Sequence, residues 1–253
     1  MKVALCFYGL LGGTKGKSGD KQGSSLDVLN LAFPHYKNHI LDKNDVDVFI
    51  HSWDEDLQSE IIEKYKPKSY IFEPVAKFKI VPPLEDTQRV QNHCCRWYSC
   101  QQVNNLKIQY EKDNNFRYDF VMLSRQDIAW GVDVNFSDFS TDYFYVPNWK
   151  HQFNGALMGY PYGGYNKSLQ DCWCFSNSKN IDELCTMFDY IPQYCIENPE
   201  LMGYRGISNH RLTYYKLLKM GIIPSKLKFA FNHDVIEKSD MPLVRYKYFN
   251  DRT

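Results

Sequence analysis

The chain has 253 residues, of which 43% are hydrophobic and 24% are charged, so it is long enough for one large α/β domain or two small ones. The 30 Lys and Arg residues balance 30 Asp and Glu residues, and the formal net charge is zero. A near-neutral chain has no overall field that draws it to nucleic acid or to an anionic membrane, so any phosphate it binds must be held by a local pocket.

The first residues predict a buried strand. Residues 2–8 are mostly apolar, and the run contains Tyr8, leads into Gly9 and shows no small-residue cleavage site of the kind that follows a secretory signal. No stretch approaches the roughly 18 apolar residues that indicate a membrane span. We therefore expect a cytoplasmic protein without a membrane span, in which the eight cysteines are reduced thiols.

The loop after this strand is GLLGGTKGKSGD at residues 9–20. Its Gly16-Lys17-Ser18 is similar to the last three residues of a nucleotide-binding P-loop motif. That motif needs a glycine at position 11, which is Leu11, and a helix directly after Ser18, where the sequence reads GDKQGSS. The P-loop interpretation therefore fails. Two interpretations remain: a flap that covers an anionic ligand with Lys15 and Lys17, which we expect to tighten when the ligand binds, and an ordinary surface loop.

The next elements alternate between helix and strand. Ser24 and Ser25 can cap a helix, in which Pro34 predicts a kink or a break. Strands are predicted at residues 46–53, 69–73 and 120–123, and helices at 55–65 and 87–112. This order predicts an α/β fold with a mostly parallel central sheet flanked by helices.

The second half of the chain is less regular. A strand is predicted at residues 143–147, a Gly-rich loop at 155–165, a short strand at 171–175, and helices at 181–191 and 208–220. No linker forces a second domain, so we expect a single domain over residues 1–253.

His93, Cys94, Cys95 and Cys100 form a cluster that invites comparison with a zinc site. Zinc sites pair two spaced cysteines with a second pair, whereas Cys94 and Cys95 are adjacent and lie in a helical pattern. We therefore expect these cysteines to pack in the core.

Polar clusters follow three of the predicted parallel strands, at the carboxyl ends where such sheets bind ligands. These are the Gly/Lys loop, His51-Ser52-Trp53 and Arg125-Gln126-Asp127. Asp127 can bind a divalent cation through oxygen, and Arg125 can hold phosphate oxygens with two parallel hydrogen bonds. The alternative is a salt-bridged pair at the end of a strand.

Three further features carry weaker signals. Asp171, at a strand start, suits a general base that takes the proton of an acceptor hydroxyl, or equally a turn residue. His233 suits a metal or phosphate ligand, or a plain surface histidine. The aromatic content of 16% and the PYGGY stretch at residues 161–165 suit contacts with a sugar ring, or a large core.

Taken together, ALCFYG, VDVFIHSW, YDFVMLSRQD and QDCWCFSNSKNIDEL resemble a family of small GT-A-like glycosyltransferases over about residues 2–220. Members of that family are encoded by large DNA viruses of algae and protists, by phages and by bacterial polysaccharide clusters. The resemblance implies a single GT-A-like (Rossmann-like) domain that transfers a sugar from a nucleotide-diphosphate sugar to a hydroxyl of a glycan acceptor, with inversion. It also implies that residues 1–130 bind the nucleotide sugar and residues 131–253 the acceptor.

The resemblance also assigns roles to single residues. It places Asp127 with Mn²⁺ or Mg²⁺ at the diphosphate, Arg125 where the family has the first Asp of its metal motif, and Asp171 as the base. That departure leaves two ways to neutralise the leaving group: a cation held by one carboxylate, or Arg125 in partial place of the cation. The expected contacts of the nucleotide sugar are Phe7, Tyr8, Gly9, Lys15, Lys17, His51, Ser52, Trp53, Arg125 and Asp127, and the expected metal ligands are Asp127 and His233.

Two other functions fit the same sequence. A sugar nucleotidyltransferase shares the sheet topology, but it needs a Gly-rich Arg/Lys signature for the triphosphate, of which the first loop is a poor version. A glycan-binding or structural protein that has lost the metal motif is the non-enzymatic alternative.

Overall fold

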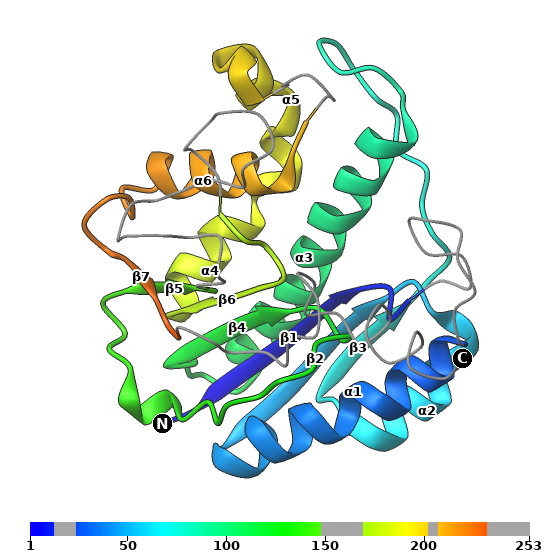
Figure 1. The fold of residues 1–253 in the computed structure, drawn as a ribbon, viewed down its shortest axis with the longest axis vertical. Coiled ribbons are helices and arrows are strands. Elements are labelled where there is room, and N and C mark those ends of the chain that lie inside the picture. The colour runs from blue at the N-terminus through cyan, green and yellow to red at the C-terminus, as the bar shows by residue number, and fades with distance from the viewer. Residues whose placement is uncertain (13–23, 148–168, 202–206, 232–253) are drawn as a thin grey trace.

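The computed structural model describes residues 1–12, 24–147, 169–201 and 207–231. They form a sheet of seven strands in the order β3-β2-β1-β4-β6-β5-β7, with helices on both faces (Figure 1). The strands are β1 (Val3–Gly9), β2 (Val46–Ser52), β3 (Ser69–Phe72), β4 (Phe120–Ser124), β5 (Phe144–Val146), β6 (Trp173–Ser176) and β7 (Leu227–Phe229). The α/β class and the mostly parallel sheet agree with the sequence prediction.

One strand runs against its neighbours. β1, β2, β3 and β4 are mutually parallel, β6 pairs antiparallel with both β4 and β5, and β7 pairs parallel with β5. Strands from both halves of the chain thus join one sheet. Because β6 is reversed, its first residues lie at the edge of the sheet where the parallel strands end.

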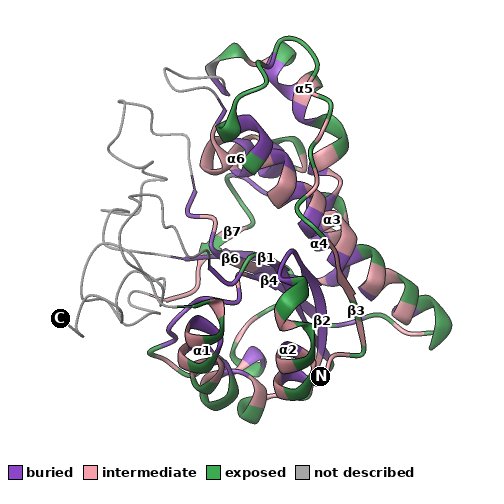
Figure 2. Ribbon diagram, turned by 90° about the vertical axis from the view of Figure 1, so that its right-hand side faces the viewer, coloured by how far each residue is buried: buried purple, intermediate pink, exposed green. Residues whose placement is uncertain are grey.

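The helices fall into two layers. α1 (Ser25–His39) and α2 (Gln58–Tyr65) lie on one face of the sheet, and α3 (Gln88–Asp113) crosses the other face over β1, β2 and β3 (Figure 1). Helices α4 (Ser178–Cys185), α5 (Met187–Glu197) and α6 (Asn209–Lys219) extend this second layer, and α4 packs on β4 and β6. Figure 2 shows the central strands buried between helices whose outer sides are exposed.

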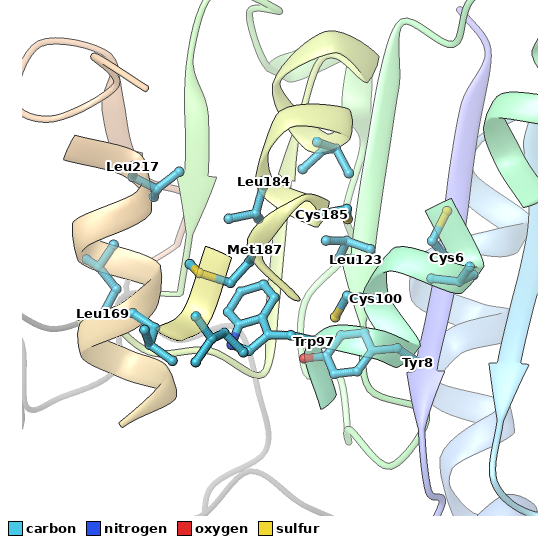
Figure 3. Packing of buried hydrophobic residues seen from close by; sticks show 14 of the residues in the cluster. Cys6, Tyr8, Trp97, Cys100, Leu123, Leu169, Leu184, Cys185, Met187 and Leu217 are labelled. Carbon is cyan, nitrogen blue, oxygen red and sulfur yellow. The ribbon is translucent and has the colours of Figure 1, made fainter. Parts of the chain in front are cut away.

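Alternate residues of β1 enter two different cores, because successive side chains of a strand point to opposite faces. Figure 3 shows the core under α3, in which side chains of the sheet meet those of α4, α5 and α6. On the α3 face the buried β1 residues are Ala4, Cys6 and Tyr8, and on the α1 face they are Val3, Leu5 and Phe7.

A buried lysine fixes α3 against α4. The Lys107 ammonium is fully buried and contacts Glu111 at 3.0 Å, the Ser178 hydroxyl at 2.6 Å and Asp182 at 2.5 Å. Glu111 also accepts from the Ser178 hydroxyl and from the backbone N–H of Tyr118, just before β4. This network holds α3 in place at the end of the sheet opposite to the candidate site.

The structure differs from the sequence prediction at three points. Of the kink or break predicted at Pro34, the break does not occur, since helix α1 continues through it: proline removes a single helical hydrogen bond, and the buried side of the helix, including Leu29 and Tyr36, holds it on the sheet. The helix predicted at residues 181–191 is two helices that meet at Thr186, whose hydroxyl donates to the Glu183 carbonyl. The short strand β7 was not predicted.

Two other predictions concern the cysteines and the membrane. All eight cysteines are free; Cys94 and Cys100 are buried in the core under α3, as the helical pattern predicted, whereas Cys95 is half-buried and lies outside that core. Within the described ranges, none of the helices combines the length and the apolar composition that crossing a bilayer requires.

Candidate functional site

The carboxyl ends of β1, β2 and β4 bring three polar segments together. In the strand register Gly9 lies opposite Ser52, and Phe7 lies opposite Ser124. The Ser52 hydroxyl donates to the Gly9 carbonyl at 3.1 Å. Reversed strand β6 adds Asp171 to this edge, because its first residue, Trp173, pairs with Ser124.

Asp171 forms a nearly buried ion pair with Arg96 of helix α3. The Arg96 guanidinium donates to the Asp171 carboxylate and also to its backbone carbonyl. The two side chains are 16% and 13% exposed, and His210 Nδ1 lies 3.4 Å from the second carboxylate oxygen. The Arg96 guanidinium lies over the Tyr8 ring, 5.2 Å from its centroid.

These contacts determine the protonation state of Asp171. Burial alone would raise the pKa of its carboxyl, but the attraction of Arg96, with smaller contributions from His210 and Arg125, lowers it to about 2. A carboxylate with this pKa accepts a proton poorly at neutral pH. Asp171 can act as an effective base only in a state in which Arg96 has moved to another partner.

Arg125 and Asp127 form a second ion pair at the same edge. Arg125 Nε and Nη2 donate to the two carboxylate oxygens of Asp127 at 2.8 and 2.9 Å, and the Asp127 side chain is fully buried. Burial favours a neutral Arg125, but Asp127 outweighs it and raises the pKa of the guanidinium above its usual range. This is the salt-bridged arrangement that the sequence left open as an alternative.

The described residues by themselves do not fit a divalent-cation site. Both oxygens of Asp127 are taken by Arg125, and across the described ranges no group of three or more His, Cys, Asp and Glu side chains is arranged to hold a metal ion. The other expected ligand, His233, lies outside those ranges. The predicted Mn²⁺ or Mg²⁺ therefore stays a prediction.

Asp54, which the sequence analysis did not single out, lies at this edge directly after Trp53. Its Oδ2 accepts from the backbone N–H of Leu11 at 2.7 Å and from the Ser52 hydroxyl at 3.2 Å. Burial, aided by repulsion from Asp127, raises the pKa of Asp54 to about 6 although these hydrogen bonds act in the opposite direction. Asp54 thereby anchors the start of the Gly/Lys loop to the end of β2.

His51 is the centre of a buried hydrogen-bond chain. Its Nδ1 lies 2.7 Å from the Ser99 hydroxyl, which accepts from the backbone N–H of Gly9 at 2.8 Å, and its Nε2 lies 2.9 Å from Glu73 Oε1. Burial lowers the pKa of His51, although the bond to Glu73 raises it. The chain joins β1, β2 and α3 and gives His51 a supporting role behind the edge.

The predicted aromatic contacts are largely part of the interior. Phe7 is fully buried, with ring centroids of Tyr36 and Tyr65 at 4.8 Å, and the Tyr8 hydroxyl donates to the Asp171 carbonyl at 2.9 Å. Trp53 is only 7% exposed and stacks on Tyr98. These aromatic rings therefore pack in the interior beneath the carboxyl edge of the sheet and are not exposed on its surface.

Some predicted residues fall outside the description. Lys15 and Lys17 of the proposed flap, His233, and the Gly-rich loop at residues 155–165 all lie in ranges that the structure does not describe. Their predicted contacts with the diphosphate, the metal and the sugar stay predictions.

A polar stripe on α3 is the main contribution that sequence reasoning missed. Arg89 and His93 both contact the backbone carbonyl of Ile207, at 2.9 and 2.7 Å, while Arg96 and Ser99 reach the edge. A spacing of three or four residues places all four on one side of a helix. Arg89, His93 and Arg96 at that spacing in the predicted helix were the available signal.

Comparison with models of known protein families and with curated proteins found no match to this chain.

Proposed function

We propose that the protein is a glycosyltransferase of GT-A-like fold that transfers a sugar from a nucleotide-diphosphate sugar to a hydroxyl of a glycan acceptor, with inversion. The observation that carries the proposal is the pair of arginines, Arg96 and Arg125, at one edge of the sheet. Each is bound to an aspartate that an incoming anion can replace.

A diphosphate leaving group fits this pair. Guanidinium groups bind phosphate oxygens through two parallel hydrogen bonds, and in a site with little water they stabilise the negative charge that develops as the sugar leaves. The chain has no net charge to attract an anion from a distance, so the affinity must come from these local cations.

Arg96 couples donor binding to the base. When the diphosphate takes over Arg96, Asp171 loses its strongest stabilising partner and its pKa rises towards the ordinary value. Asp171 then accepts the proton of the acceptor hydroxyl, whose oxygen forms the new bond to the anomeric carbon. The bond from that carbon to the diphosphate oxygen breaks, and its electron pair leaves with the nucleotide diphosphate.

The first test is calorimetric titration with a panel of UDP- and GDP-sugars, with Mn²⁺ and with a chelator instead. We expect the wild type to bind at least one of them and to hydrolyse it slowly without acceptor. Arg96→Lys and Arg125→Lys should each weaken binding about tenfold or more, because lysine cannot reproduce the paired hydrogen bonds. Arg117→Lys, at the other end of the sheet, is the matched control and should bind as the wild type does.

Other outcomes would contradict the proposal. Tight binding of a nucleoside triphosphate with a sugar phosphate would favour a nucleotidyltransferase. Binding of free glycan alone, with no affinity for any nucleotide sugar, would favour a glycan-binding protein. Loss of binding in the chelator would instead add the expected metal requirement to the proposal and would not contradict it.

A further inference from the structure

The side-chain carboxamide of Gln126, between Arg125 and Asp127, is unusual in its lack of hydrogen bonds. The side chain is fully buried, yet neither Oε1 nor Nε2 has a hydrogen-bond partner. Within the described part of the chain, no other side chain leaves two buried polar atoms without a partner. The side chains with a single such atom are Tyr65, Arg96, Trp97, Asn104, Trp130 and Asn209.

Burying an amide without partners is unfavourable, because the group gives up its hydrogen bonds to water and receives none in return. An apolar side chain of the same size would make the ligand-free protein more stable. Such exceptions in folded proteins call for a specific explanation, and functional sites are a common one. Gln126 lies at the carboxyl edge of the sheet, between the two members of the Arg125–Asp127 pair.

We propose that Gln126 is a specificity-determining residue of the donor site. Its carboxamide presents a donor and an acceptor side by side, so it recognises a group that offers an acceptor beside a donor. Two parts of a nucleotide sugar have this chemistry: the imide edge of a pyrimidine base, and vicinal hydroxyls of the sugar. The inference rests on the proposed function and adds to it the residue that reads the donor.

The burial of Gln126 has a kinetic consequence. A ligand reaches its amide only after the residues that cover it have moved aside, so association should be slower than for an open site. The amide then gains both hydrogen bonds in the bound state alone. Selectivity follows, because a ligand that lacks the matching group leaves the amide unpaired.

Gln91 provides a matched comparison. It is also buried, but its Oε1 accepts from the Phe78 N–H at 3.0 Å, and its Nε2 donates to the Phe78 carbonyl and to Asp86. The same substitution, glutamine to leucine, removes satisfied hydrogen bonds at Gln91 and unsatisfied groups at Gln126.

The experiment measures the thermal midpoint and the nucleotide-sugar affinity of Gln126→Leu, Gln91→Leu and the wild type. We expect Gln126→Leu to raise the midpoint by about 2–4 °C and to weaken binding about tenfold. Gln91→Leu should lower the midpoint and leave the affinity unchanged. Titration of the wild type and of Gln126→Leu with uridine monophosphate and with free monosaccharides identifies which part of the donor the amide contacts.

Each result decides one question. A midpoint that falls in Gln126→Leu shows a structural partner for the amide and overturns the inference, as does a raised midpoint with unchanged affinity. A wild type that binds no nucleotide sugar overturns the proposed function instead. In that case the free-monosaccharide titration tests Gln126 directly, and equal affinity in both forms overturns the inference.

Discussion

Arg96 binds both the side chain and the backbone carbonyl of Asp171, so one ion pair joins helix α3 to the residue that leads into reversed strand β6. The pair links two segments that are far apart in the sequence. Although burial raises the pKa of the proposed base, the attraction of Arg96 outweighs it and lowers this pKa to about 2.

Donor binding should therefore change the proton affinity of Asp171. If the diphosphate takes Arg96, the pKa of Asp171 rises, and at about pH 3–4 the complex takes up a proton that the free protein lacks. At pH 7 both states are ionised and no proton is taken up at this group. Calorimetry at each pH in two buffers of different ionisation enthalpy measures the uptake.

Asp171→Asn is the control for that experiment, since it removes the titrating group and should abolish the acid-side uptake. The same variant tests the catalytic role: a folded Asp171→Asn protein with normal turnover would rule out Asp171 as the base.

Asp54→Asn should stabilise the protein above pH 6. The pKa of Asp54 is raised in the fold, so its carboxylate costs stability once the pH exceeds the unfolded value near 4, and the cost levels off above about 6. The asparagine keeps an acceptor for the Leu11 N–H without the buried charge. The free energy of unfolding, measured with urea, should rise by about 3 kcal/mol at pH 7 and by close to zero below pH 4. A variant that is less stable at pH 7 would show that the charge itself is needed to hold the loop.

His93→Gln should remove an acid sensitivity. Burial lowers the pKa of His93 to about 4, although its bond to the Ile207 carbonyl acts the other way, so the folded protein holds it neutral. As the pH falls from 6.5 to 4, the unfolded chain binds a proton at His93 before the folded protein does. The free energy of unfolding of the wild type therefore falls by about 3 kcal/mol, and that of the variant does not. The difference in unfolding free energy between the two proteins, measured at pH 7 and pH 4.5, checks this. Parallel pH profiles would contradict a buried neutral His93.

Ser99→Ala should destabilise the junction of β1, β2 and α3. The Gly9 N–H would lose its acceptor and His51 Nδ1 its partner, at an expected cost of about 1–3 kcal/mol. Ser59→Ala, on the exposed side of α2, is the control and should stay within about 0.5 kcal/mol of the wild type. Equal stability of the two variants would mean that the hydroxyl is replaceable by water.

Local patterns in the sequence predicted most strands of the sheet and the polar segments that follow them, whereas β7 and the reversal of β6 were not predicted. Short apolar runs predicted β1, β2 and β4, and the polar residues after them predicted the edge where Arg125 and Asp127 lie. The order of strands and helices predicted their parallel arrangement.

The pairing at the site was beyond local patterns. Arg96 meets Asp171 only because α3 crosses β1 and β6 runs backwards, and no periodicity encodes either fact. Asp54 was missed although it directly follows the His51-Ser52-Trp53 cluster, since a lone carboxylate after a strand reads as a turn residue. The tertiary arrangement, not the residue type, raises its pKa and makes it distinctive.

The reversal of β6 also determines where the chain that joins β5 to β6 meets the sheet. β5 ends, and β6 begins, at the edge that carries Arg96 and Arg125, so the connection between these two strands leaves and re-enters the sheet beside the site. The register of β6 against β4 and β5 is set by residues of these strands themselves, through the pairs of Ser124 with Trp173 and of Tyr145 with Phe175. The ends of β5 and β6 thus fix where the chain between them leaves and rejoins the sheet, whatever its length.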